Sequence, residues 1–138
     1  MITAIILAAG QSKRMGQPKM LLPWGNTTVL GQIIETLQRA GVENILVVTG
    51  SAREEVEEVV KQYAVSSRQN ADYAREEMFS SLQTGLRAAR DNPSMTAALI
   101  CLGDQPQVEE RNVRAVVDAF KARKSHLVVP SYQMRRGH

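Results

Sequence analysis

The sequence predicts an α/β fold of three layers, α/β/α, with a mostly parallel, doubly wound sheet in the middle. Two observations predict it. Short, nearly continuous apolar runs recur along the 138 residues, as expected for parallel strands that are buried on both faces. Amphipathic segments lie between these runs, as expected for helical crossovers. The length suits one domain, residues 1–138, with a core of its own.

Five apolar or β-branched runs predict the strands. Because crossovers between parallel strands are right-handed, a sheet that starts at its centre is expected to have the strand order 3-2-1-4-5. The predicted strands are Thr3–Leu7, Asn44–Thr49, Val65–Gln69, Ala97–Leu102 and Leu127–Val129.

Apolar residues at helical spacing predict helices between these strands. The first is Val29–Ala40, with Gly41 where a helix end favours glycine, and the last is Glu109–Arg123. A capping box from Ser51 to Glu54 predicts the start of the second helix.

Two serines, Ser80 and Ser81, predict the N-cap of the third helix. This helix is expected to bury one side, which carries Leu82, Leu86 and Ala89.

Composition excludes several classes of protein. No apolar run approaches the roughly 20 residues that span a bilayer, so no membrane association is expected. The single cysteine, Cys101, lies inside an apolar run and is expected to be a small core residue in a reducing compartment, which indicates a cytoplasmic protein. Aromatic residues make up 4% and are not interleaved with a basic stripe, so nucleic acid is not expected as a partner.

Positive charge is concentrated near the start of the chain. The first acidic residue is Glu35, and the segment before it contains Lys13, Arg14 and Lys19. A positive field without counter-charges suits a small polyanion.

The fold predicts where such a ligand would bind. Open α/β sheets bind ligands beyond the carboxyl ends of their strands, at the switch point of the strand order. The switch point here lies between the first and fourth predicted strands, which are followed by the loops Ala8–Lys19 and Gly103–Val108.

The first of these loops has the composition of a phosphate-binding loop. Small residues and glycines let backbone N–H groups approach a ligand, while Arg14 offers a planar fork and Lys19 a point charge for phosphate oxygens. It is neither a dinucleotide fingerprint, since Ser12 stands where the second glycine is required, nor a P-loop, since Lys19 lies three residues after Gly16. A plain surface loop is the alternative, but about a dozen residues is long for a connection of this kind.

The same residues resemble a known family. The pattern Leu7-Ala8-Ala9-Gly10-x-Ser12-x-Arg14-Met15-Gly16-x-x-Lys19, followed by Leu21-Leu22-Pro23, is similar to the signature of nucleotidyltransferases with a Rossmann-like, glycosyltransferase-A-like fold. Within them the chain looks most like the molybdenum cofactor cytidylyltransferases and next like the molybdopterin guanylyltransferases. The resemblance implies that the loop wraps a nucleoside triphosphate, and that Arg14 and Lys19 neutralise its phosphates. Ala9, where guanosine-type enzymes tend to have glycine, favours CTP over GTP.

A carboxylate follows the fourth predicted strand. Asp104 comes directly after Ala97–Leu102 and Gly103, facing the first loop, where it could hold Mg²⁺ together with substrate phosphates. The alternative is that it caps the next helix. The resemblance supports the metal role, because Leu102-Gly103-Asp104-Gln105-Pro106 is similar to the family's metal-binding stretch.

A third candidate group lies after the third predicted strand. Asn70, Ser80 and Ser81 are expected to contact the base or an anion at a helix N-terminus, with simple capping as the alternative. The family usually has Gly-Met-Ser-Ser-Ser here, and this chain departs from that pattern at Glu77 and Phe79.

The resemblance implies transfer of a nucleoside monophosphate to a phosphorylated acceptor such as molybdopterin. The tail Arg136-Gly137-His138 is similar to a turn after which the family continues to a second metal-binding aspartate, so the chain is expected to lack the family's C-terminal third. The alternatives are a sugar-phosphate nucleotidyltransferase and a non-catalytic nucleotide-binding module.

Overall fold

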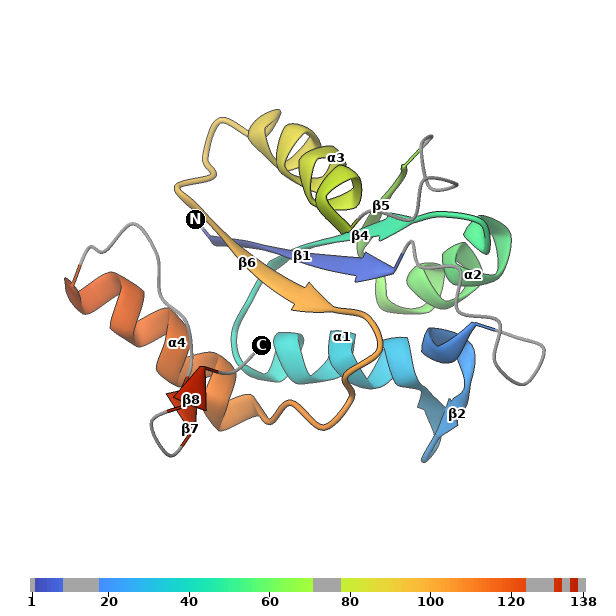
Figure 1. Ribbon diagram of the computed structural model, residues 1–138, viewed down its shortest axis with the longest axis horizontal. Coiled ribbons are helices and arrows are strands. Elements are labelled where there is room, and N and C mark those ends of the chain that lie inside the picture. Colours follow the sequence, from blue (N-terminus) through green and yellow to red (C-terminus); the bar gives the residue numbers. More distant parts are fainter. Residues whose placement is uncertain (1, 9–17, 71–77, 124–130, 133–134, 137–138) are drawn as a thin grey trace.

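A central sheet with helices on both faces organises the chain (Figure 1). The computed structural model describes residues 2–8, 18–70, 78–123, 131–132 and 135–136. The elements of the sheet and its crossovers are β1 (Ile2–Ala8), α1 (Val29–Arg39), β4 (Asn44–Thr49), α2 (Arg53–Tyr63), β5 (Ser66–Gln69), α3 (Met78–Arg90), β6 (Ala97–Leu102) and α4 (Glu110–Arg123). The smaller elements are the 3₁₀ helix η2 (Lys19–Leu21) and the strands β2 (Pro23–Trp24), β3 (Thr27–Thr28), β7 (Ser131–Tyr132) and β8 (Arg135–Arg136).

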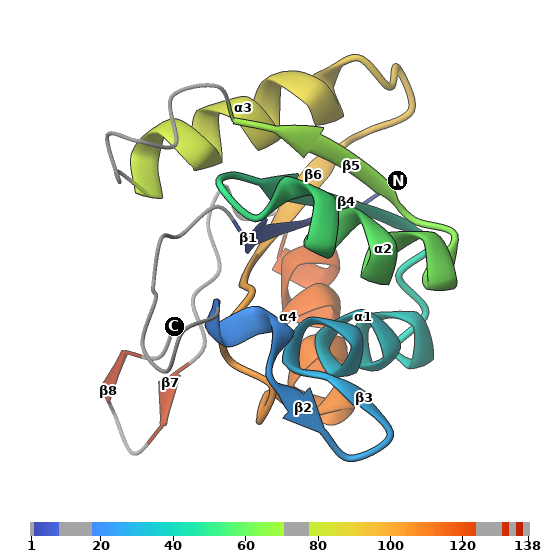
Figure 2. The same cartoon turned by 90° about the vertical axis from the view of Figure 1, so that its right-hand side faces the viewer.

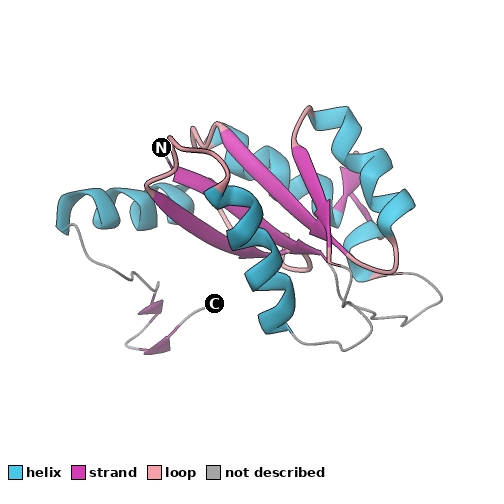
Figure 3. Cartoon of the chain, turned by 90° about the horizontal axis from the view of Figure 1, so that it is seen from above, coloured by secondary structure: helices cyan, strands magenta, loops and turns pink. Residues whose placement is uncertain are grey.

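The sheet confirms the predicted topology as far as the described residues reach. Four parallel strands lie in the order β5-β4-β1-β6, which is 3-2-1-4 in the numbering of the predicted strands, and they run side by side in Figure 3. The predicted fifth strand, Leu127–Val129, lies outside the described residues. The hairpins β2–β3 and β7–β8 were not predicted.

The two faces of the sheet carry separate apolar layers. Ile6 and Val47 face the larger cluster, which α1, α2 and α4 cover, whereas Ile5 and Val48 face α3. Figure 2 shows α3 on one side of the sheet and α1 with α4 on the other. Successive residues of β1 and β4 point to opposite faces of the sheet, and the residues on both faces are buried. This explains why these two strands are mostly apolar.

Three helix predictions need correction. The predicted capping box at the start of α2 is not formed. The helix starts at Arg53, its N-cap is Ala52, and no side chain makes a capping hydrogen bond there. Ala52 is buried in the core, which fixes the start of the helix. Ser80 and Ser81 are not N-caps, because α3 already begins at Met78. Leu86 remains 38% exposed, because the side of α3 that faces the sheet carries Ser81, Gly85 and Ala89 instead.

Candidate functional site

The carboxyl ends of β1 and β6 meet at one point of the sheet edge. The two strands pair from Ile2 with Ala97 to Leu7 with Leu102, so the loops that follow them start side by side. The Gly103 N–H donates a 3.0 Å hydrogen bond to the Leu7 carbonyl. A Cβ atom at position 103 would lie 2.8 Å from that oxygen, so only glycine allows this contact without a shift of the backbone.

This contact places Asp104 at the start of the first loop. Asp104 is exposed, and the turn around it is closed by a 3.4 Å bond from the Gln105 N–H to the Leu102 carbonyl. Helix α4 begins only at Glu110, so Asp104 is not the cap of that helix. Within the described part of the chain, no hydrogen bond or ion pair engages its carboxylate. Its oxygens are therefore available to a ligand that approaches from solvent.

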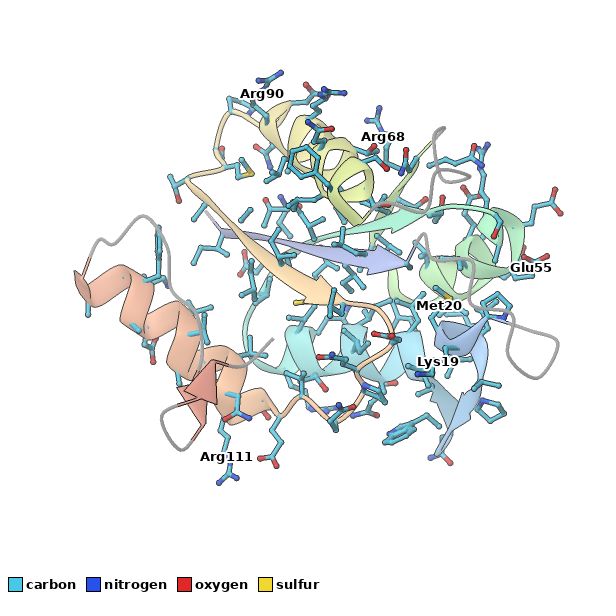
Figure 4. The ribbon with its side chains drawn as sticks, in the orientation of Figure 1. Lys19, Met20, Glu55, Arg68, Arg90 and Arg111 are labelled. Atoms are coloured by element: carbon cyan, nitrogen blue, oxygen red, sulfur yellow. The ribbon has the colours of Figure 1, made fainter. Side chains whose placement is uncertain are left out.

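Lys19 lies at the same end of the molecule. It begins η2, between the first loop and the β2–β3 hairpin, and its side chain is exposed. The next residue, Met20, is 6% exposed and packs into the core together with Ala8. Figure 4 shows Lys19 and Met20 near the ends of β1 and β6. The buried methionine thus anchors a segment whose lysine remains free to reach a phosphate group.

Asn70, Ser80 and Ser81 are brought together, as expected for one group. Asn70 follows β5, is 3% exposed, and its N–H bonds the Thr49 carbonyl at 2.8 Å. Its side-chain amide donates to the Ser80 hydroxyl at 3.0 Å and to the Ser81 hydroxyl at 3.1 Å. The serines lie in the first turn of α3, the end of a helix that favours an anion. The cluster ties this helix start to the end of β5.

The predicted site residues of the first loop fall into two groups. Of its predicted site residues, Leu7 and Ala8 belong to β1, and Ala8 is 2% exposed. The remaining ones lie outside the described residues; these are Ala9, Gly10, Ser12, Arg14 and Gly16.

Sequence reasoning missed two features near this edge. The first is the β2–β3 hairpin, whose two-residue turn Gly25-Asn26 is a hairpin signal of the kind that predicts such turns. Gly25 has φ of +59°, as that turn requires. The second is Thr49, which ends β4 beside Ala8. Its hydroxyl is fully buried and, within the described part of the chain, has no hydrogen-bond partner.

Cys101 is not part of this chemistry. It packs, partly buried, against the larger core cluster, and burial raises the pKa of its thiol to about 12. A thiol that remains protonated at neutral pH is a poor nucleophile and metal ligand. The expectation that Cys101 is a small core residue agrees with this environment.

Two features are absent from the described ranges. No helix there combines the length and apolar character that crossing a membrane requires. The same residues contain no cluster of three or more His, Cys, Asp or Glu side chains that would hold a metal ion. A cation at Asp104 would therefore take its other ligands from substrate and water, or from residues beyond the described ranges.

Comparison with known proteins gives consistent matches. The family model of the MobA-like NTP transferase domain matches residues 4–138. The bifunctional protein GlmU of Symbiobacterium thermophilum is 34% identical over 135 residues, which cover 88% of this chain and 26% of GlmU. The molybdenum cofactor cytidylyltransferase of Escherichia coli is 30% identical over 138 residues, which cover 99% of this chain and 67% of that protein.

Solved structures agree with these matches. The crystal structure of Rv0371c from Mycobacterium tuberculosis has a TM-score of 0.83 and 34% identity, covering 99% of this chain and 68% of that one. The complex of Rv0371c with manganese has a TM-score of 0.75 and 32% identity. The chain thus spans about a quarter of the GlmU relative and about two thirds of the cytidylyltransferase and of Rv0371c.

Proposed function

The chain belongs to the family of MobA-like NTP transferase domains, and we propose that it transfers CMP from CTP to a phosphorylated acceptor, with release of pyrophosphate. The observation that carries the proposal is the contact between the two loops at the sheet edge. The bond from Gly103 to Leu7 fixes Asp104 beside the origin of the basic, glycine-rich loop. A carboxylate beside a phosphate-binding loop is the arrangement that a metal-assisted phosphoryl-group transfer needs.

In this proposal the first loop and Lys19 hold the triphosphate. Arg14, Lys19 and the N–H groups of the first loop, with Ala9, Gly10, Ser12 and Gly16, hold the β- and γ-phosphates. An oxygen of the acceptor phosphate attacks the α-phosphorus in line, the bond from that phosphorus to the β-phosphate oxygen breaks, and pyrophosphate leaves. The side chains act by positioning the reactants and by neutralising charge, without a side-chain base.

Asp104 is the residue that fits Mg²⁺. Its carboxylate is exposed, and Mg²⁺ often takes one or two carboxylates together with substrate oxygens. When bound, the ion supplies positive charge to the phosphates and the leaving pyrophosphate. The manganese complex of Rv0371c supports a divalent cation in this family.

The base and the acceptor are inferred from the resemblance. Ala9, Gln105 and the match to the Escherichia coli molybdenum cofactor cytidylyltransferase support CTP and a molybdopterin acceptor. Asn70, Ser80 and Ser81 are proposed to contact the nucleotide from the start of α3, in keeping with the hydrogen bonds that group them. GTP with the same acceptor is the second choice, and the match to GlmU keeps a different phosphorylated acceptor, such as a sugar phosphate, as the third.

A panel of the four nucleoside triphosphates tests the proposal. Thermal unfolding is followed with each triphosphate and Mg²⁺, because a ligand that binds only the native state raises the unfolding temperature. We expect the largest increase with CTP, and pyrophosphate release when a phosphorylated acceptor is added. A larger increase with GTP would reassign the base. Binding without turnover for any acceptor would indicate a non-catalytic nucleotide-binding module, and no increase with any triphosphate would contradict the proposal.

A further inference from the structure

Three side chains from three elements form a short hydrogen-bond relay. Tyr63, at the end of α2, has its hydroxyl 2.7 Å from the Thr27 hydroxyl in β3 and 2.7 Å from a carboxylate oxygen of Glu35 in α1. A carboxylate only accepts, and a tyrosine hydroxyl has one proton. Tyr63 therefore donates to Glu35, and Thr27 donates to Tyr63. The relay links the β2–β3 hairpin to both helices.

The relay is built into the packing of α1. A side chain at Gly31 would collide with the Thr27 hydroxyl and lie 2.8 Å from the Tyr63 hydroxyl. The Tyr63 carbonyl accepts a 3.2 Å bond from the Gln38 amide. Since Gln38 lies seven residues after Gly31, the tyrosine runs along about two turns of α1. Tyr63 is thus held at its backbone and at its hydroxyl.

Burial and the neighbouring Glu35 keep the Tyr63 hydroxyl protonated. Burial raises the pKa of Tyr63, the bond from Thr27 lowers it, and Glu35 raises it further. The phenol consequently remains a donor throughout the physiological pH range. Glu35 is also paired with Arg39, 3.8 Å away.

The backbone connects this relay to Lys19. Thr27 pairs with Trp24 across the hairpin. The Val29 N–H bonds the Leu22 carbonyl at 3.0 Å, and the Leu22 N–H bonds the Lys19 carbonyl at 3.2 Å. Lys19 is therefore separated from Thr27 by a few hydrogen-bonded residues.

We infer that Tyr63 is a positioning residue, which acts through Thr27 and the β2–β3 hairpin to hold Lys19 where it meets the triphosphate. The inference rests on the proposed function, because it assumes that Lys19 binds phosphate. Tyr63 itself touches no substrate. Triphosphate affinity would then depend on a residue at the C-terminal end of α2.

The test combines two conservative variants with a double-mutant cycle. Tyr63→Phe removes the hydroxyl but keeps the ring, and Thr27→Val removes only the arm to the hairpin. The dissociation constants of CTP and GTP with Mg²⁺ are measured by calorimetry, with KM and kcat where turnover is found. Each variant loses one hydrogen bond, so we expect its affinity for the triphosphate to fall by about twofold to tenfold. The kcat should be unchanged. The effect of Tyr63→Phe should disappear in a Lys19→Ala background, because coupled sites are not additive.

A matched control separates positioning from general loss of stability. Gln38→Ala removes the other hydrogen bond to Tyr63 but leaves the hairpin arm intact, so triphosphate affinity should stay at the wild-type value. Equal affinity of wild type, Tyr63→Phe and Thr27→Val would overturn the inference, as would a Tyr63→Phe effect that persists in Lys19→Ala. If the wild-type chain binds none of the four nucleoside triphosphates, the proposed function itself fails, which is a distinguishable result.

Discussion

Replacing Gly103 with alanine tests whether the two loops must meet in direct backbone contact. The added Cβ would lie 2.8 Å from the Leu7 carbonyl oxygen, 3.3 Å from the Ala8 Cβ and 3.4 Å from the Ala8 Cα. The closest atom belongs to the backbone of the central strand, which cannot rotate away. The end of β6, and Asp104 with it, would have to move away from β1.

The expected magnitude follows from two opposing contributions. Overpacking of a well-packed site costs about 1–3 kcal/mol, while a Gly→Ala replacement lowers the entropy of the unfolded chain and returns about 0.4–1 kcal/mol. The net loss of stability should therefore lie between about 0 and about 2.6 kcal/mol. A misplacement of about 1 Å can lower the rate of a positioned reaction by about 100-fold, so turnover should fall by roughly 10- to 100-fold.

Urea unfolding and Mg²⁺-dependent pyrophosphate release measure the two effects on the same preparation. Gly85→Ala in α3 is the matched control, because its Cβ would meet Ile5 Cγ2 at 2.5 Å and Val48 Cγ2 at 3.0 Å, in the core. It should lose stability but keep the turnover of the folded protein. If Gly103→Ala kept both its stability and its turnover, the reasoning about the loop contact would be refuted.

Three further predictions follow from the described contacts. Asn70→Ala leaves the buried Ser81 hydroxyl without its donor, so urea unfolding should show a loss of about 1–3 kcal/mol; an unchanged midpoint would contradict this. Lys19→Ala removes an exposed cation, so calorimetry should show weaker triphosphate binding with unchanged stability, and unchanged affinity would exclude its phosphate role. For Cys101, between the ordinary pKa of 9.0 and about 12 the folded protein holds a proton that the unfolded chain has released. Stability should therefore fall with rising pH above 9 more steeply in wild type than in Cys101→Ala, and parallel pH curves would contradict burial of the thiol.

The sheet was predictable because burial on both faces leaves a strong trace in the sequence. Asn44–Thr49 and Ala97–Leu102 were predicted with the bounds that the structure shows. The edge strand β5 is shorter by one residue than its prediction and alternates between exposed and half-buried positions. Strand order followed from crossover handedness, which does not depend on individual contacts.

Helix starts were less predictable because tertiary contacts decide them. Ser51 has a favourable cap pattern, but Ala52 is drawn into the core and becomes the N-cap. Ser80 and Ser81 are fixed by Asn70, ten and eleven residues earlier, and the helix extends beyond them. An N-cap side chain contributes about 1 kcal/mol to stability. Burial of Ala52 and the hydrogen bonds of Asn70 can contribute more than this.

The candidate site was predictable in outline but not in its contacts. The residue types around Asp104 and Lys19 indicate phosphate and metal chemistry, and strand order brings their loops to one edge. The contact between Gly103 and Leu7, and the relay from Thr27 to Tyr63, join positions 96 and 36 residues apart. No local pattern encodes such pairings, since they depend on how the layers pack.

The most direct test of the account is Mg²⁺-dependent pyrophosphate release by Asp104→Asn, compared with wild type across a Mg²⁺ titration. Because Asp104 is exposed, the substitution should change stability by no more than about 0.5 kcal/mol. The account predicts that turnover is lost while the triphosphate still binds. Wild-type turnover with an unchanged Mg²⁺ requirement would contradict it.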